Sequence, residues 1–236
     1  MCIMKGYIFG YIDVERVGME IRKETIKKQV REWINLGYIV PEDIPSIELY
    51  MDQITTFMDK FLSKNKRTEE DKTLTKTMIN NYTKNDLLPP SNNKRYSKEH
   101  IILLIYIYYL KHVISINDIQ TVLTPLIDKF YDNKDKNHSL EDIYANIYEL
   151  EKRQFFNTAN SITKTYELIE RGFSEDDDDY LKEFTFLSLI GYDIFMKKKL
   201  MEHIIDEMAE RTQKEESKAK SKEKSKNSKP KDVKKK

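Results

Sequence analysis

The chain has 236 residues, of which 41 are Lys or Arg and 40 are Asp or Glu. Its six glycines are too few for a Rossmann domain, a P-loop domain or a turn-rich β-sandwich. The single cysteine excludes an intramolecular disulfide and fits a reducing cytoplasm. The longest strongly apolar run, Ile101–Leu110, is too short to span a bilayer. The composition therefore predicts a soluble cytoplasmic protein without a membrane partner.

Apolar residues recur every three to four positions along nearly the whole chain, which predicts an all-α fold. The first helix is expected at Met19–Leu36. A second is expected at about 47–63, capped by Ser46. A short polar helix, Leu74–Lys84, should follow and lead into a connector rich in Pro and Asn.

The middle of the chain carries two further helix-start signals. Ser97 is expected to cap a very apolar helix over 98–113. A capping box at 115–118 opens a helix at about 116–131, within which Pro125 predicts a kink or a break.

The second half predicts two long helices. Capping boxes at 139–142 and 174–177 open helices over about 140–170 and 175–210. The apolar face of the last helix is wide enough to suggest burial against a second subunit, so a homodimer is expected. Residues 211–236 contain almost nothing apolar and are expected to be disordered.

Charge is distributed unevenly. Residues 64–113 carry a net charge of +5, residues 114–210 carry −10 and residues 211–236 carry +8. The basic end would give weak attraction to DNA or acidic surfaces, or would simply aid solubility. The expected regions are an N-terminal extension with one helix (1–46), a helix-turn-helix-like domain (47–135), a helical dimerisation or effector region (136–210) and a disordered Lys-rich tail (211–236).

The sequence offers no catalytic motif. None of the four histidines pairs with a cysteine at metal-ligand spacing, and His203 with Glu207 is best explained as a solvated surface pair. The run Asp176–Asp179 fits a solvated helix start. We therefore expect neither an enzyme nor a metal or cofactor site. Large aromatic side chains on apolar helices are expected to pack in the core; these are Trp33, Tyr106, Tyr108 and Tyr109.

The basic middle has a different character. Its polar helix carries two adjacent asparagines, Asn80 and Asn81, which weaken a helix but are suited to contacting base edges. After a Pro turn, Lys94 and Arg95 form a cationic tip of the kind that contacts phosphates. The layout predicts a winged helix-turn-helix with a recognition helix at about 74–84 and a basic wing at about 90–96. Its candidate DNA-binding residues are Thr75, Lys76, Thr77, Asn80, Asn81, Lys84, Lys94, Arg95 and Tyr96.

The run I-N-N-Y-x-K-x-x-L-L-P-P, followed by K-R-Y-S-x-E-H, resembles the recognition helix and wing of MerR-type transcription regulators. A closer resemblance is to the bacterial domain of unknown function 1836, on four motifs in order over roughly 47–135. That resemblance implies a DNA-binding regulator. Asp86 and Asn80 stand where the MerR pattern has Gly and Arg, and the wing lacks glycine. The motifs are Tyr50–Gln53, Met78–Pro89, Lys94–His100 and Leu110–Ile119.

Two functions remain open on the sequence. The first is a transcriptional regulator that binds double-stranded DNA. The alternative is a non-catalytic protein-interaction module that kept the fold without DNA binding. Salt dependence separates them, because each phosphate neutralised gives a log–log slope of about −0.9.

Overall fold

The computed structural model describes most of the chain from residue 39 onward. Helical residues between 25 and 32 agree with the predicted first helix, whose other residues, Trp33 among them, lie outside the described part. The described residues are 25–26, 28–30, 32, 39–133, 135, 137–174 and 178–227, with only the backbone described at 216 and 219–227.

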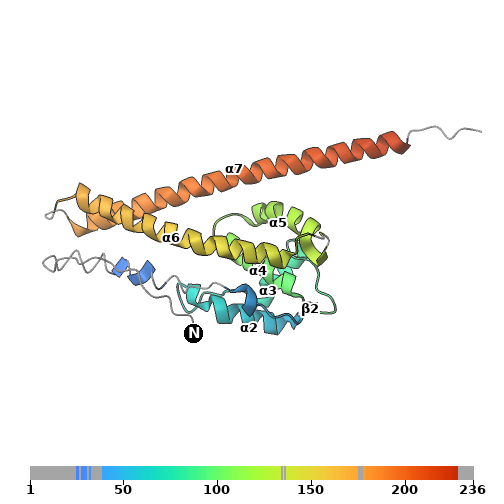
Figure 1. Ribbon diagram of the computed structural model, residues 1–236, viewed down its shortest axis with the longest axis horizontal. Coiled ribbons are helices and arrows are strands. Elements are labelled where there is room, and N and C mark those ends of the chain that lie inside the picture. Colours follow the sequence, from blue (N-terminus) through green and yellow to red (C-terminus); the bar gives the residue numbers. More distant parts are fainter. Residues whose placement is uncertain are drawn as a thin grey trace, which may run out of the picture.

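Helices dominate the described residues, which confirms the all-α prediction (Figure 1). Two very short strands and three single 3-10 turns complete the fold. The helices are α2 (Met51–Leu62), α3 (Lys76–Lys84), α4 (Lys98–Leu110), α5 (Ile116–Phe130), α6 (Leu140–Gly172) and α7 (Asp179–Asn227). The strands are β1 (Leu49–Tyr50) and β2 (Arg95–Tyr96), and the 3-10 turns are η1 (Pro41–Asp43), η2 (Ser63–Asn65) and η3 (Tyr131–Asn133).

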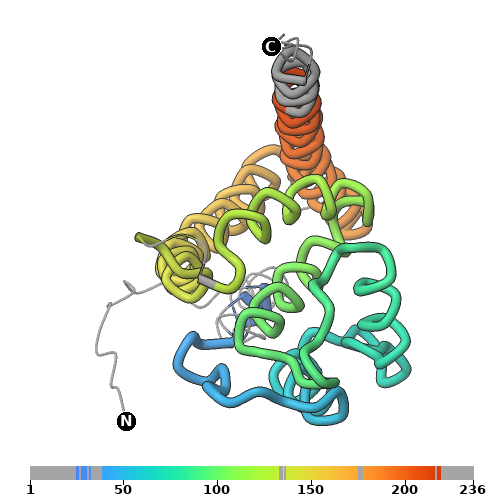
Figure 2. Tube along the Cα trace, turned by 90° about the vertical axis from the view of Figure 1, so that its right-hand side faces the viewer, coloured from blue at the N-terminus to red at the C-terminus, as the bar shows by residue number. Residues whose placement is uncertain are grey.

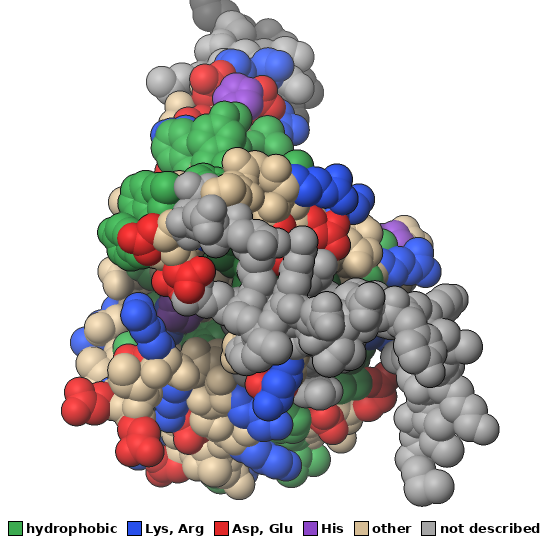
Figure 3. All heavy atoms as spheres, turned by 90° about the vertical axis from the view of Figure 1, so that its left-hand side faces the viewer, with side chains coloured by type: hydrophobic (Ala, Val, Ile, Leu, Met, Phe, Trp, Pro, Cys, Tyr) green, Lys and Arg blue, Asp and Glu red, His purple; other side chains and the backbone are tan. Residues whose placement is uncertain are grey.

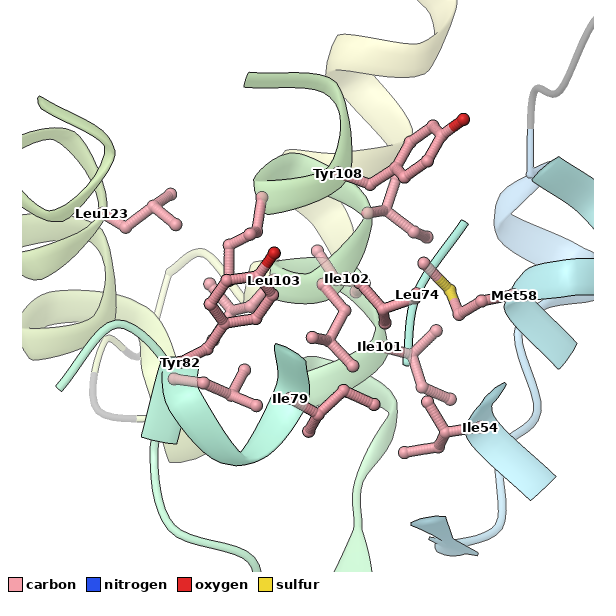
Figure 4. Close-up of a cluster of buried hydrophobic side chains, with 14 of the residues drawn as sticks. Ile54, Met58, Leu74, Ile79, Tyr82, Ile101, Ile102, Leu103, Tyr108 and Leu123 are labelled. Atoms are coloured by element: carbon pink, nitrogen blue, oxygen red, sulfur yellow. The ribbon is translucent and has the colours of Figure 1, made fainter. Parts of the chain in front are cut away.

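Helix α4 is the centre of the core. It is apolar on all sides, and eight of its thirteen residues are buried. Side chains from α2, α3 and α5 converge on it; Ile54, Ile79 and Leu123 represent these three helices in Figure 4. Because α4 has no polar face, it requires cover from every direction, and the other elements are arranged around it.

The strands explain where α2 begins. Leu49 pairs with Tyr96 and Tyr50 with Arg95 in an antiparallel ladder. The predicted start at 47 with Ser46 as cap is therefore wrong, because the residues before Met51 are extended and paired. The N–H of Tyr50 donates to Gln53 Oε1 at 2.8 Å and closes the helix start instead.

The helix starts at Ser97, Ser115 and Ser139 are confirmed. The expected break at Pro125 is not observed, since α5 runs unbroken from Ile116 to Phe130. Apolar side chains on both sides of Pro125, such as Leu123 and Ile127, pack on the core. This packing holds the helix together across the one hydrogen bond that proline cannot donate.

Helices α6 and α7 extend beyond this core and diverge from the end where they are joined (Figures 1 and 2). The hydroxyl of Tyr144 in α6 donates to the carbonyl of Ile39 at 2.6 Å and fixes the near end of α6. No helix in the described part of the chain has both the length and the apolarity needed to cross a membrane.

Helix α7 differs from prediction at both ends. The described residues include Asp178, whose carboxylate accepts from the N–H of Tyr180 at 2.9 Å, and the helix begins at Asp179. The proposed capping partner at 177 lies outside the described residues. At the other end, helix continues through 211–227, where disorder was expected. Lys, Glu, Gln and Ala are strong helix formers, and extending an existing helix needs no new nucleus.

Candidate nucleic-acid interface

Helix α3 presents five of the candidate residues on one exposed face. At 3.6 residues per turn they span an arc of about 140°. The opposite side carries Ile79 and Tyr82, which are buried in the core. A polar face of this width is open to solvent along the whole helix. The five exposed residues are Lys76, Thr77, Asn80, Asn81 and Lys84.

The start of α3 is set by Thr75. Its hydroxyl accepts from the N–H of Met78 at 3.2 Å, which makes it the helix cap. Leu74, predicted to be the first helical residue, lies before the helix and is buried. Thr75 is therefore a structural residue of α3, and its side-chain oxygen is engaged by the backbone.

Helix α3 is terminated by an aspartate, not a glycine, in the left-handed conformation. Asp86 has a φ of 53°, the left-handed conformation that glycine usually supplies after a helix. The N–H of Leu87 donates to the carbonyl of Tyr82 at 2.9 Å, and that of Asp86 donates to Thr83 at 3.3 Å. These two bonds form a Schellman motif, so α3 ends just as it would with the glycine of the MerR pattern.

The connection between α2 and α3 covers residues 63–75, longer than the three to four residues of a compact helix-turn-helix. Asp59 in α2 holds this loop, because its carboxylate accepts from Lys66 Nζ at 2.8 Å and Thr73 Oγ1 at 3.0 Å. These bonds lower the pKa of Asp59. At the far end, Gln120 of α5 donates to the carbonyl of Asn85 at 3.1 Å. Helix α3 is thus fixed before its start and after its end.

The basic tip is a tight β-hairpin. Asn92 and Arg95 exchange backbone hydrogen bonds of 3.0 and 2.8 Å. Asn93 and Lys94 between them have φ values of 48° and 63°, as a type I′ turn requires. Asn tolerates this conformation well, whereas Lys at the second position is strained. The turn places the Lys94 side chain at the exposed tip of the hairpin.

The hairpin and α3 are both bonded to residues at the start of α2, Tyr50 just before the helix and Asp52 in its first turn. Arg95 Nε donates to the hydroxyl of Tyr50 at 3.3 Å, and its guanidinium lies 5.5 Å from the centre of that ring. The hydrogen bond raises the pKa of Arg95. Close by in sequence, Asp52 forms an ion pair with Lys76 at the start of α3. The two parts of the predicted surface are therefore joined through Tyr50 and Asp52.

Tyr96 does not belong to this surface. Its side chain is only 5% exposed and packs edge-on against His100 with ring centres 5.3 Å apart. The N–H of Ser97 donates to His100 Nδ1 at 3.0 Å, while the hydroxyl of Tyr131 lies 3.2 Å from Nε2. Burial lowers the pKa of His100. Tyr96 anchors the hairpin to the core and leaves no free ring face for a ligand.

Sequence reasoning missed Tyr50 and Asp52. Both belong to the Tyr50–Gln53 motif, but nothing local indicates that they would lie beside residues more than twenty positions away. The tyrosines of α4 do pack in the core as expected, with Tyr108 buried and Tyr106 and Tyr109 partly buried.

The His203–Glu207 pair, which has the spacing of half a metal site, lies on the surface of α7. His203 Nε2 lies 3.4 Å from Glu207 Oε1, with both side chains more than half exposed, which matches the expected solvated pair. Within the described ranges, no group of three or more His, Cys, Asp or Glu side chains is placed to hold a metal ion.

Residues 39–147 match a family model described as Domain of unknown function (DUF1836). This match includes the predicted stretch 47–135 and confirms the resemblance inferred from the motifs. The matched segment carries α2 to α5, the hairpin and the start of α6. No curated protein and no solved structure matches the chain.

Proposed function

We propose that this protein is a DNA-binding transcriptional regulator that places α3 in the major groove and the 91–96 hairpin against the phosphate backbone. The observation that carries the proposal is the single exposed face on α3. A helix needed only for packing gains nothing from two adjacent exposed asparagines, which disfavour helix. Asn can form two hydrogen bonds with adenine in the major groove.

Electrostatics support the same orientation. Lys84, Lys94 and Arg95 are exposed around α3 and the hairpin. The Tyr50 hydroxyl restricts the Arg95 guanidinium, so less side-chain freedom is lost when it contacts a phosphate. The resemblance to the recognition helix and wing of MerR-type regulators adds to this argument.

The pair between Lys76 and Asp52 opposes binding in part. Asp52 is exposed and neutralises one of the cations at the start of α3. A phosphate has to compete with this carboxylate for Lys76. We therefore expect moderate affinity and a salt dependence that reflects only a few phosphate contacts, each contributing about −0.9 to the log–log slope.

Fluorescence anisotropy tests the proposal with the full chain, the DNA upstream of its own gene and a scrambled duplex of equal length. Salt should run from about 50 to 200 mM, over which several phosphate contacts weaken binding by orders of magnitude. The ratio of the two affinities is the decisive quantity, because attraction by the Lys-rich end is the same for both duplexes. We expect a clear preference for the upstream duplex.

Two substitutions separate base contacts from phosphate contacts. Asn81→Ala should reduce the preference between duplexes by about 1–3 kcal/mol and leave the salt slope unchanged. Lys94→Gly should weaken both duplexes alike and reduce the slope by about 1. Glycine suits the φ of 63° at this position, so the hairpin stays folded, which Lys94→Ala would not guarantee.

Asp52→Asn should change DNA affinity in the opposite direction from the two substitutions above. Removing this carboxylate frees Lys76 and should tighten binding to both duplexes. Equal affinity for the two duplexes, with no effect of Asn81→Ala, would refute the proposal. That result would favour a protein-interaction module instead.

A further inference from the structure

Helix α7 exposes far more apolar surface than a soluble helix needs. Eleven large hydrophobic side chains between residues 180 and 204 are at least 41% exposed. Green hydrophobic side chains are massed in the upper part of the end view in Figure 3, below the uppermost purple histidine. Monomeric proteins rarely expose contiguous apolar patches of this kind without an interaction partner. The eleven residues are Tyr180, Leu181, Phe184, Leu187, Leu189, Tyr192, Ile194, Phe195, Met196, Leu200 and Ile204.

The chain's own core does not use this surface. Near its start, α7 contacts α6, where the rings of Tyr166 and Phe186 meet edge-on at 5.7 Å. Further along, Met201 and Ile205 pack against the core. Every residue of 191–200 between these two anchors is exposed. The helix is therefore held at two places and leaves its middle uncovered.

Part of the exposed set forms one stripe. Tyr180, Phe184, Leu187, Gly191 and Ile194 are separated by four, three, four and three residues, the spacing of a coiled-coil seam. Apart from the adjacent residues and the backbone of α7 itself, no atom of the described residues lies within 4 Å of the position that a Cβ on Gly191 would occupy. The stripe thus has a gap at Gly191, between the bulky side chains of Leu187 and Ile194.

Charge differs at the two ends of the stripe. Asp179 and Glu183 lie near its beginning, and the basic triplet 197–199 follows its end. Between them, residues 184–196 include only one charged side chain, Asp193. Two such helices side by side attract when they run in opposite directions. Running in the same direction and in register, they place acid against acid and lysine against lysine.

We propose that a second copy of this chain covers the stripe, with the two α7 helices antiparallel and centred near residue 189. In this register Leu187 of each copy lies opposite Gly191 of the other, so the large side chain fills the gap over the small one. Lys198 comes within one helical turn of Asp179 and Glu183 of the second copy. One segment thereby supplies both halves of a self-complementary interface.

The mass of the full chain in solution tests association. Sedimentation equilibrium should give twice the single-chain mass of 28.2 kDa. Leu187→Glu should shift the mass to that of one chain. Leu189→Glu is the matched control, because residue 189 lies two positions away but about 160° around the helix. It should leave the dimer intact. Both positions are exposed, so circular dichroism should show unchanged helix content in each variant.

A charge reversal tests the orientation. Lys198 is exposed, so Lys198→Glu disturbs no buried group. In the antiparallel pair it brings acid to acid and should raise the dissociation constant at low salt, and adding Glu183→Lys should restore it. In a parallel pair the same change relieves repulsion between lysines and tightens association. A monomeric chain, tighter association with Lys198→Glu, or dissociation by Leu189→Glu alone would each overturn the proposal.

Discussion

Helices α4 and α7 are both rich in Ile, Leu, Phe and Tyr, yet their environments are opposite. In α4, residues 101–105 are at most 1% exposed, because α2, α3, α5 and α6 surround it. In α7, Leu187 is 67% exposed. The apolar side chains of α4 are buried by other helices of the same chain, whereas many of those of α7 are left exposed to solvent.

The difference indicates what each region needs in order to fold. The segment 39–147 supplies the whole core cluster except Ile205 and Met201, which come from α7. The arm formed by the far part of α6 and by α7 has helix propensity and two anchoring contacts, but no enclosed core. Stability of the domain should therefore respond to changes in α4 and hardly at all to changes in the middle of α7.

The largest expected effect tests this contrast directly. Leu103→Ala removes a side chain that is 0% exposed and should lower the free energy of unfolding by about 3 kcal/mol. Leu189→Ala, the same change at a 41% exposed position of α7, should alter it by less than about 0.5 kcal/mol. Urea unfolding followed by circular dichroism measures both. Similar losses for the two variants would mean that domain and arm share one core.

A smaller effect is expected where α6 begins. The Ser139 hydroxyl accepts from the N–H of Asp142 at 3.0 Å and donates to its carboxylate at 2.6 Å, which lowers the pKa of Asp142. Ser139→Ala should therefore lower the free energy of unfolding by about 1 kcal/mol at neutral pH. A lowered folded-state pKa stabilises above the ordinary Asp range, so the loss should shrink as pH falls below about 4.

The control for this cap is Ser161→Ala, which lies on the exposed side of the same helix away from either end. Alanine has the higher helix propensity, so this variant should be neutral or slightly stabilised. Equal losses at 139 and 161, or a loss at 139 that does not change with pH, would remove the cap as the cause.

The smallest expected effect is a gain in stability. Asp86→Gly should raise the free energy of unfolding by about 0.5–1 kcal/mol, because glycine adopts the φ of 53° without strain. Asp86→Ala should lower it. If Ala and Gly behave alike in thermal unfolding, the backbone conformation at the end of α3 is not what limits stability there.

Local signals explain the accurate sequence predictions. The helix starts after Ser97, Ser115 and Ser139 depend on a serine and the residue three positions later, so they are visible in a short stretch of sequence. The exposed face of α3 follows from helical spacing alone. The family resemblance was likewise contained in short motifs.

Distant partners explain most of what was missed. Tyr50 and Arg95 are 45 residues apart, and no local pattern shows that they meet or that β1 displaces the predicted start of α2. Lys94 and Asp86 adopt left-handed conformations without the glycine that usually marks them. Tyr96 was assigned to the surface because the sequence does not reveal that its ring packs on His100.

The length of α7 has a mechanical consequence. At 1.5 Å per residue, its 49 residues extend for about 74 Å. Because Ile205 packs against the core, the 22 residues from 206 to 227 extend for about 33 Å beyond that contact, and a tilt of about 5° there displaces the far end by about 3 Å. A probe attached near residue 218, about 20 Å beyond Ile205, would move by about 2 Å for the same tilt, so it would report on packing at Ile205 from a distance.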